Sequence, residues 1–218
     1  MTAPFRICAC AAILATAVAC GNGSTVAPTA TTKTNGPDSP VVERIVPSTG
    51  SISGTRVTIT GRGFRTGATV VIEEAAVGVV VVNSETITAM TPVLTKEVSA
   101  ADVIVINPDE HSGRLAGAFR YASFSIASSE AVVTANGTLS VTWKTSAAGA
   151  SDWIGLFRKE SPNTAYNSGW WQYTGGASTG TFTLTAPAAL GDYEFRYLLD
   201  DGFNDTTRSG LVTVVAER

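Results

Sequence analysis

Apolar and polar residues alternate with a period of two along much of the chain beyond residue 40. In the run 55–60, Val57 and Ile59 fall on one face and the polar residues around them on the other. Successive side chains of a strand point to opposite faces, so this alternation predicts a strand with one buried face. Seven short apolar or alternating runs of this kind lie at residues 41–46, 55–60, 68–72, 77–82, 86–90, 102–106 and 116–121.

Turn-forming residues separate these runs. Gly61 and Gly63 follow one of them, and Asn107-Pro108-Asp109 follows another. Gly adopts positive φ angles at no steric cost, and Asn, Pro and Asp favour turns for reasons of their own. Seven short strands joined by regular turns predict a β-sandwich over residues 41–121.

A second group of alternating runs lies between residues 123 and 215. Asn136-Gly137 suits the positive φ angles of a two-residue turn, so residues 132–139 are expected to form a hairpin. No amphipathic helical pattern of useful length accompanies these runs. The predicted fold class is therefore all-β, with two tandem immunoglobulin-like β-sandwiches. Further strands are expected at residues 139–143, 181–185, 193–199 and 211–215.

The N-terminal residues 1–19 have the pattern of an export signal. Arg6 precedes an apolar run that is too short to span a bilayer and ends in small residues. Residues 20–40 are rich in Thr, Pro, Gly and Ser and lack apolar periodicity, so a disordered, flexible tether is expected there. All three cysteines lie within residues 1–20, so no disulfide is expected to stabilise the sandwiches.

The residues directly before Cys20 carry a second signal. Ala17-Val18-Ala19-Cys20 resembles the bacterial lipobox, although Ala17 replaces the usual leucine. The resemblance implies that Cys20 is lipidated and that the lipid attaches the protein to the membrane of the cell envelope. Gly21 after the cysteine implies sorting to the outer membrane, on its periplasmic or its outer side, as in Gram-negative lipoproteins. An ordinary secretory signal cut at a nearby Ala-x-Ala site is the alternative.

Composition and charge exclude some partners. Thr, Val, Ser, Gly and Ala dominate, and they suit pleated strands and tight turns. The 218 residues have a formal net charge of −3, and the basic residues are scattered along the chain. A nucleic-acid partner is therefore not expected, because such proteins carry a basic stripe or patch.

Many spaced residues of the first unit form a recognisable pattern. They are Ile45, Pro47, Gly50, Ser51, Gly54, Thr55, Val57, Ile59, Gly61, Gly63, Phe64, Gly67, Val70, Ile87, Thr91, Pro92, Asn107, Pro108, Asp109, Gly113, Phe119 and Tyr121. This pattern resembles the IPT/TIG domain, an immunoglobulin-like fold that serves as a spacer or an interaction module. Glu73-Glu74 departs from the small residues common in relatives, which is expected to alter an exposed turn.

The second unit has a sparser pattern, in Trp143, Asp152–Phe157, Trp171-x-Tyr173-Thr174 and Gly191-x-Tyr193-x-Phe195-Arg196-Tyr197. It resembles a compact β-sandwich of the SKICH type. Modules of this kind occur beside phosphoesterase and other hydrolase domains, but no catalytic domain is expected in this sequence.

Candidate catalytic and metal-binding residues are few. The single histidine, His111, lies in a polar turn, and the sequence has no nucleophile elbow. We therefore expect His111 to be a solvated loop residue, and we expect no enzymatic activity. No cofactor is expected. Calcium prefers clustered carboxylate and carbonyl oxygens, and the acidic segment around Asp200, Asp201 and Asp205 is a weak calcium candidate whose spacing does not fit an EF-hand. Common turn chemistry explains the same residues equally well.

All four tryptophans lie in the second unit, and two of them are consecutive. Trp143 and Trp153 are expected in the core, but Trp170 and Trp171 cannot both face inward on one strand. Tyr173 falls on the same face as Trp171. Exposed Trp and Tyr near amides and carboxylates suit sugar binding, so Trp170, Trp171 and Tyr173 are the candidate ligand-binding residues. Packing of both faces within the fold is the alternative.

These observations predict a non-enzymatic lipoprotein of the cell envelope. Its two β-sandwich modules are expected to bind a glycan or an envelope protein, or to act as a spacer. The alternative is an accessory subunit of a separately encoded phosphoesterase or glycosidase. The sequence contains no further segment that predicts a membrane span.

Overall fold

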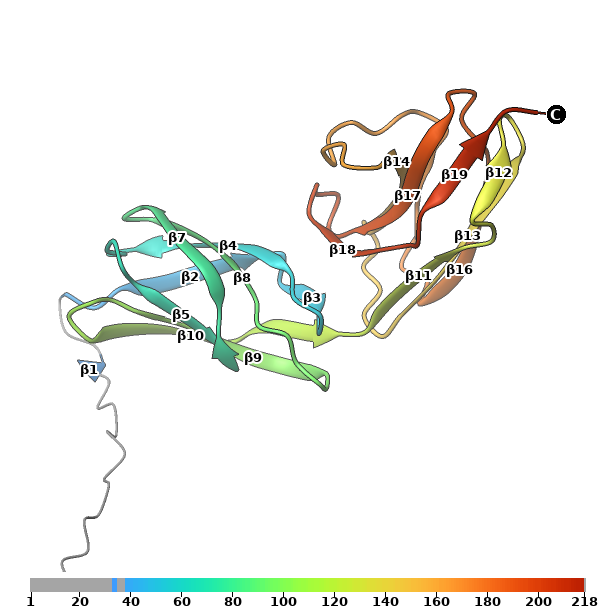
Figure 1. Cartoon of the computed structure of the whole chain (residues 1–218). Helices are drawn as coiled ribbons and strands as arrows, with labels where there is room; N and C mark the ends of the chain where they lie inside the picture. The colour runs from blue at the N-terminus through green and yellow to red at the C-terminus, as the bar shows by residue number, and fades with distance from the viewer. Residues whose placement is uncertain (1–32, 35–37, 218) are drawn as a thin grey trace, which may run out of the picture. The chain divides into compact units, whose positions relative to one another are not determined.

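The computed structural model describes residues 33–34 and 38–217, which contain strands and turns and no helix. A membrane-spanning helix is accordingly not found among these residues. Two β-sandwich-like units follow each other along the chain (Figure 1). The predicted signal peptide 1–19, the predicted lipidation site Cys20 and most of the predicted tether 20–40 lie outside the described residues.

The first sandwich consists of two sheets that pack face to face. All seven predicted runs are strands, and the structure adds three short strands at Lys33–Thr34, Thr49–Ser51 and Glu74–Ala75. One sheet has the order β2 (Val41–Val46), β4 (Arg56–Arg62), β8 (Thr86–Met90) and β7 (Val77–Asn83). The other has the order β1 (Lys33–Thr34), β10 (His111–Ala122), β9 (Val98–Ile106), β5 (Thr69–Ile72) and β6 (Glu74–Ala75), with β3 (Thr49–Ser51) also paired to β10.

The alternation in β4 determines which side chains form the first core. Val57 and Ile59 are fully buried, as predicted, and Phe64 is buried in the same cluster. A Cβ atom at Gly61 would lie 2.0 Å from the Val41 carbonyl oxygen and 2.8 Å from the Phe64 ring, so only glycine fits there. Gly63 has a φ of 74°, and its carbonyl accepts a hydrogen bond from the Asn107 side chain. These contacts explain why the glycines, the phenylalanine and the asparagine stand at these spacings.

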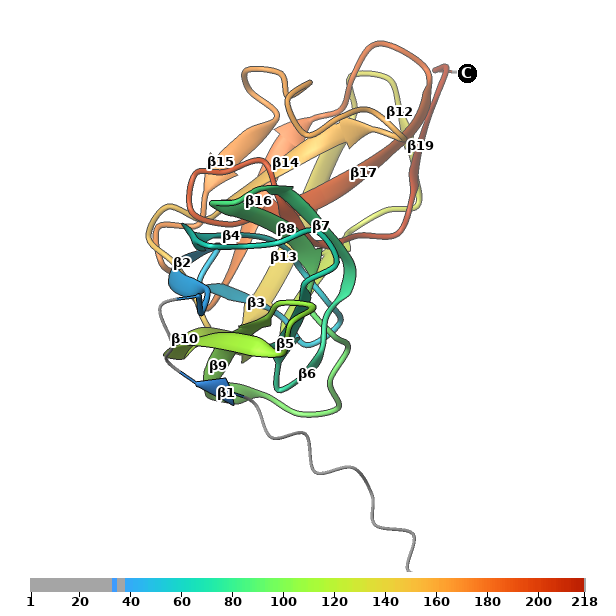
Figure 2. The same ribbon diagram turned by 90° about the vertical axis from the view of Figure 1, so that its left-hand side faces the viewer.

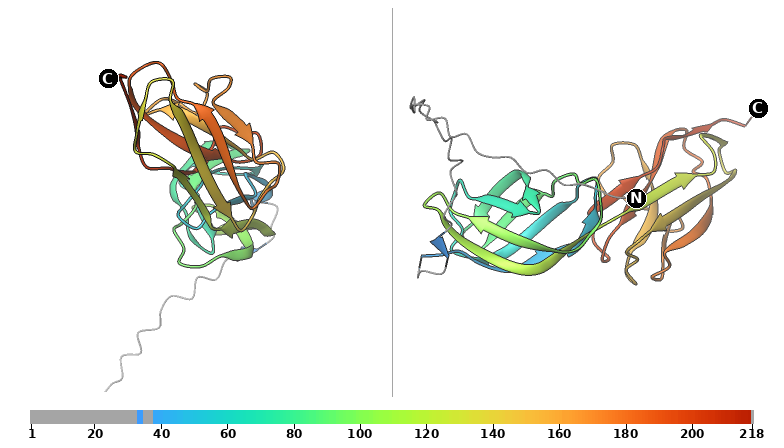
Figure 3. Two further views of the ribbon diagram at one scale, coloured as in Figure 1. Left: turned by 90° about the vertical axis from the view of Figure 1, so that its right-hand side faces the viewer. Right: turned by 90° about the horizontal axis from the view of Figure 1, so that it is seen from below.

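The second sandwich also has two sheets, which Figures 2 and 3 show from further directions. The smaller sheet has the order β11 (Phe124–Ser128), β13 (Thr138–Thr145) and β16 (Thr179–Thr185). The larger has the order β12 (Val132–Thr134), β19 (Val212–Val215), β17 (Gly191–Leu198), β14 (Trp153–Arg158) and β15 (Trp171–Tyr173), with β18 (Asp205–Arg208) also paired to β17.

The predicted hairpin at residues 132–139 is wrong. Asn136 has the expected positive φ of 60°, but β12 pairs in parallel with β19, whereas β13 pairs with β11 and β16. The turn therefore carries the chain from one sheet to the other. Val133 and Leu139 enter the same core from opposite sides. Alternation indicates that each segment is a strand but does not indicate which strand is its neighbour.

Both faces of the central strand β17 are buried. Tyr193, Phe195 and Tyr197 belong to the main core between the sheets. The alternate residues Glu194 and Arg196 are also buried, on the opposite face. Because β14 pairs with β17, its side chains also alternate between the main core and the outer face of the larger sheet. That outer face carries the candidate site.

Candidate functional site

Aromatic side chains gather on the outer face of β14 and β15. Strands β14 and β15 are neighbours (Figure 2). In their antiparallel register Trp153 lies opposite Tyr173, and Gly155 lies opposite Trp171. Residues directly opposite each other point to the same face of a sheet. Trp153, Trp171 and Tyr173 therefore stand together, with ring centroids 5.9 Å apart for the two tryptophans and 5.1 Å apart for Trp171 and Tyr173.

Two connections complete the site. Tyr166 comes from the connection between β14 and β15, and Phe203 from the connection between β17 and β18. Their rings stack on each other with centroids 6.0 Å apart, and each meets Trp153 edge to face. The resulting hollow has a volume of about 220 Å³. This aromatic hollow is lined by Trp153, Tyr166, Trp171, Tyr173, Asp201 and Phe203.

A carboxylate stands at the edge of the aromatic hollow. The Tyr173 hydroxyl donates a hydrogen bond of 2.6 Å to Asp201 Oδ1, and this bond raises the pKa of Tyr173. Asp200 and Asp201 both have positive φ angles, 54° and 55°, and form the turn that presents the Asp201 carboxylate. Within residues 38–217 no Lys or Arg forms an ion pair with Asp201. The hollow therefore carries a negative charge that no Lys or Arg side chain among residues 38–217 neutralises.

Trp153 forms the buried floor of the hollow. Its side chain is 4% exposed, and its indole Nε1 donates a hydrogen bond of 3.0 Å to the Gly202 carbonyl. Gly155 lies between Trp153 and Phe157 on the same face of β14. A Cβ atom there would lie 2.9 Å from the Phe157 ring and 3.1 Å from the Trp153 ring. The missing side chain lets these large rings lie close to the sheet.

A buried ionic network supports both connections. Arg196 is 1% exposed, forms an ion pair of 2.7 Å with Glu194 and lies 4.6 Å from the centroid of the Phe157 ring. It also donates a hydrogen bond of 2.6 Å to Asn163 Oδ1. Asn163 Nδ2 in turn donates to the Phe203 carbonyl at 2.7 Å. Asn163 thus joins the connection that carries Tyr166 to the one that carries Phe203.

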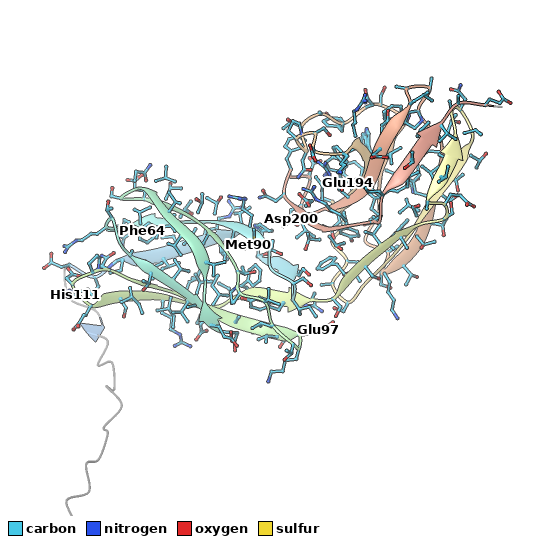
Figure 4. All side chains as sticks on the ribbon, viewed as in Figure 1. Phe64, Met90, Glu97, His111, Glu194 and Asp200 are labelled. Atoms are coloured by element: carbon cyan, nitrogen blue, oxygen red, sulfur yellow. The ribbon has the colours of Figure 1, made fainter. Side chains whose placement is uncertain are left out.

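Asp205 completes this network. Burial raises the pKa of its carboxyl, but hydrogen bonds from Arg208 and Asn163 hold that pKa below the usual value. Arg208 also pairs with Glu194 at 2.8 Å. The two arginines are therefore balanced by two carboxylates. Figure 4 shows Glu194 and Asp200 on the second sandwich.

The structure brings together two of the three predicted ligand-binding residues. Trp171 and Tyr173 line the aromatic hollow. Trp170 does not, because its half-buried ring packs edge to face on Tyr193, 6.2 Å away, beside the main core. Trp143 is in that core, as predicted. Trp153 is buried, as predicted, but in a separate cluster on the outer face of the sheet.

The sequence interpretation did not include Trp153, Tyr166 and Phe203 in the site. Tyr166 and Phe203 are 46% and 47% exposed, and each lies in a polar, turn-rich segment with no adjacent aromatic residue. A large aromatic residue that is isolated in such a loop is a signal of a binding surface. That signal identifies the two residues as candidates but does not indicate that they meet.

The calcium hypothesis finds no support in the geometry. The Asp205 carboxylate is bound by Arg208 and Asn163, and the Asp201 carboxylate accepts from Tyr173. Among the described residues there is no group of three or more His, Cys, Asp or Glu side chains that is placed to hold a metal ion. Asp200 and Asp201 thus shape a turn, and the Asp201 and Asp205 carboxylates bind different partners.

His111 is not the loop residue that the sequence predicts. It is the first residue of β10 and is half-buried, with Nδ1 at 3.4 Å from a carboxylate oxygen of Asp109. It lies in the first sandwich and takes no part in the aromatic hollow.

Comparison with known proteins identifies the first unit. The family model for the IPT/TIG domain matches residues 40–121. Residues 40–121 are an IPT/TIG domain. This confirms the resemblance seen in the spaced glycines and prolines. A second β-sandwich-like region follows the IPT/TIG domain, and its likeness to the SKICH type stays a prediction.

The solved structures that match this chain are distant in sequence. The extracellular region of plexin A4 is 16% identical, with a TM-score of 0.44, and covers 82% of this chain. The Escherichia coli adhesin FdeC is 16% identical over 82% of the chain, with a TM-score of 0.33. SGBP-B of a Bacteroides ovatus mixed-linkage glucan utilization locus, solved with a mixed-linkage heptasaccharide, is 14% identical over 83%, with a TM-score of 0.34.

The chain spans only part of these structures: 16% of the plexin chain, 64% of the FdeC chain and 46% of the SGBP-B chain. No curated protein matches the sequence.

Proposed function

We propose that this protein is a non-enzymatic lipoprotein of the cell envelope whose second β-sandwich binds a ligand in the aromatic hollow. The observation that carries the proposal is the cluster of rings on the outer face of β14 and β15. Tyr166, Tyr173 and Phe203 are each more than 40% exposed, so each presents a large apolar surface to solvent. Contiguous exposed aromatic residues of this kind mark binding sites.

The support beneath the rings favours a site that exists before the ligand arrives. Trp153 is fixed by its hydrogen bond to Gly202, and Asn163 ties the two connections together. A site that is already ordered loses less conformational entropy on binding. Such an arrangement favours recognition of a ligand over a purely structural role for these rings.

The side chains that line the hollow favour binding over catalysis. The titratable groups among them are two tyrosines and one aspartate, with no His, Cys or Lys. The set holds one carboxylate, whereas glycoside hydrolysis ordinarily uses two, and the hydrogen bond to Asp201 raises the pKa of Tyr173, which disfavours its phenolate as a nucleophile. The IPT/TIG domain would then act as the spacer between the proposed lipid on Cys20 and the binding module.

A glycan array and an envelope-protein pull-down test the proposal. We expect the wild type to retain a ligand and Trp171→Ala to lose at least about tenfold in affinity, because Trp171 forms a wall of the hollow. Trp170→Ala is the matched control: it removes the neighbouring indole, which lies outside the hollow, and is expected to retain binding once its fold has been checked by circular dichroism. Equal loss in both variants, or none in either, would contradict the proposal.

A further inference from the structure

The rings of the aromatic hollow enclose a space instead of forming a flat platform. The interplanar angle is 69° between Trp153 and Tyr166, and 88° between Trp153 and Phe203. Trp171 meets Tyr166 at 86° and Tyr173 at 90°. Rings at such angles present faces and edges to one small volume from several directions. A flat sugar ring stacks best on a single exposed face, whereas a compact round group contacts several faces at once.

The charge of the hollow favours a cation. Asp201 is the one charged side chain that lines it, and Asp200 is its neighbour in the chain. The nearby cations are already balanced, because Arg196 and Arg208 pair with Glu194 and Asp205. A carboxylate beside the negative faces of several aromatic rings attracts a positively charged ligand.

Two of the four side-chain hydrogen-bond donors that line the hollow are committed to the protein, and the other two are the Tyr166 hydroxyl and the Trp171 indole N–H. The Trp153 indole N–H donates to the Gly202 carbonyl, and the Tyr173 hydroxyl donates to Asp201. Sugar hydroxyls need several directed partners in their site. A quaternary ammonium group needs none, since it has no N–H to satisfy and is bound by ring faces and by a negative charge.

The size of the hollow fits a small group. Its volume of about 220 Å³ lies below the range of roughly 300–1,000 Å³ that is usual for drug-sized ligands. A trimethylammonium group with a short tail is compact enough for such a space.

Building on the proposed function, we propose that the aromatic hollow binds a small organic cation with a quaternary ammonium group, of the choline type. The rings of Trp153, Tyr166, Trp171 and Phe203 surround the methyl groups, and Asp201 faces the positive charge. The free cation is favoured over the phosphocholine headgroup of a lipid, because a phosphate next to Asp200 and Asp201 would be repelled.

Titration of the purified protein with choline chloride, followed by tryptophan fluorescence, tests this assignment. Trp153 and Trp171 both line the hollow, so binding is expected to change their emission. The neutral isostere dimethylbutanol, in which carbon replaces the nitrogen of choline, is the control ligand. We expect it to bind at least about tenfold more weakly, because it has the shape of choline without the charge.

Matched variants test the role of the carboxylate. Asp201→Asn keeps an acceptor for the Tyr173 hydroxyl, removes the charge and is expected to weaken choline binding about fivefold or more. Asp200→Asn makes the same change one residue away, outside the lining, and is expected to stay within about twofold of the wild type. Phe203→Leu keeps apolar bulk without a π face and is expected to weaken choline binding more than dimethylbutanol binding.

The outcomes separate this inference from the proposed function. Equal affinity for choline and dimethylbutanol, or an Asp201→Asn variant that binds choline like the wild type, would overturn the cation assignment. Binding to phosphatidylcholine vesicles without binding to choline would overturn the choice of the free cation. If choline does not bind but the glycan array gives a signal that depends on Trp171, the cation assignment is wrong and the ligand site stands. If neither assay gives a signal, both the cation assignment and the proposed ligand site are contradicted.

Discussion

Gly180 lies directly opposite Trp143 in the β13–β16 pair, where the indole occupies the space above it. A Cβ atom at Gly180 would lie 2.2 Å from the Trp143 ring. The ring is buried in the second core, and its Nε1 donates to the Ala177 carbonyl at 3.1 Å. It therefore has little room to move.

We expect Gly180→Ala to lower the free energy of unfolding by about 1–3 kcal/mol, because overpacking displaces a buried ring. Urea denaturation followed by circular dichroism measures the change. Gly210→Ala is the control, since its φ is not in the left-handed region and nothing lies within 4 Å of its added Cβ atom. A shift of similar size in both variants would show that the contact with Trp143 is not the cause.

At the scale of elements, β7 is an edge strand with an apolar outer side. It stands at the end of its sheet and pairs with β8. Val77, Val80 and Val82 are 59%, 55% and 57% exposed, whereas Val81 packs against the first core. Exposed apolar edge strands promote pairing with another chain, although the register shifts within β7 interrupt its ladder.

We expect Val80→Lys to raise the protein concentration at which the chain self-associates, because a charge on the edge opposes strand pairing. Light scattering over a concentration series measures this. The free energy of unfolding is expected to stay within about 0.5 kcal/mol of the wild type, as for other surface changes. Val81→Lys is the contrasting variant and should destabilise the fold. Unchanged self-association in Val80→Lys would contradict the assignment to this edge.

At the scale of the whole molecule, the proposed anchor and the two sandwiches have separate roles. Among residues 38–217, the clusters of buried residues in the sandwiches begin at Val42 and contain no cysteine. Folding of the sandwiches should therefore not depend on the lipid.

We expect Cys20→Ser to move the protein from the membrane fraction to the soluble fraction, because the thiol is the proposed site of lipidation. Its thermal unfolding midpoint should equal that of the wild type. Fractionation followed by immunoblotting, with the unfolding midpoint measured on the purified material, checks both parts. A variant that stays in the membrane fraction would contradict anchoring through Cys20.

Local pattern alone was sufficient to predict the seven longer strands of the first sandwich and the IPT/TIG domain. Period-two alternation, as at Val57 and Ile59, reports which residues are buried, because strand geometry links sequence position to face. The same rule placed Trp171 and Tyr173 together. Glycines and Asn107 at turns made the first unit recognisable, since their backbone angles and hydrogen bonds are requirements of local geometry.

Only the tertiary structure decided the strand partners and the composition of the aromatic hollow. The Asn136 turn connects strands of two different sheets instead of two neighbouring strands of one sheet. Either arrangement buries the apolar side chains of both strands in the same core. Arg196 is buried against Phe157, and Tyr166 meets Phe203 from a distant connection. Loop residues follow no period, so their contacts depend on the long-range packing that closes the fold.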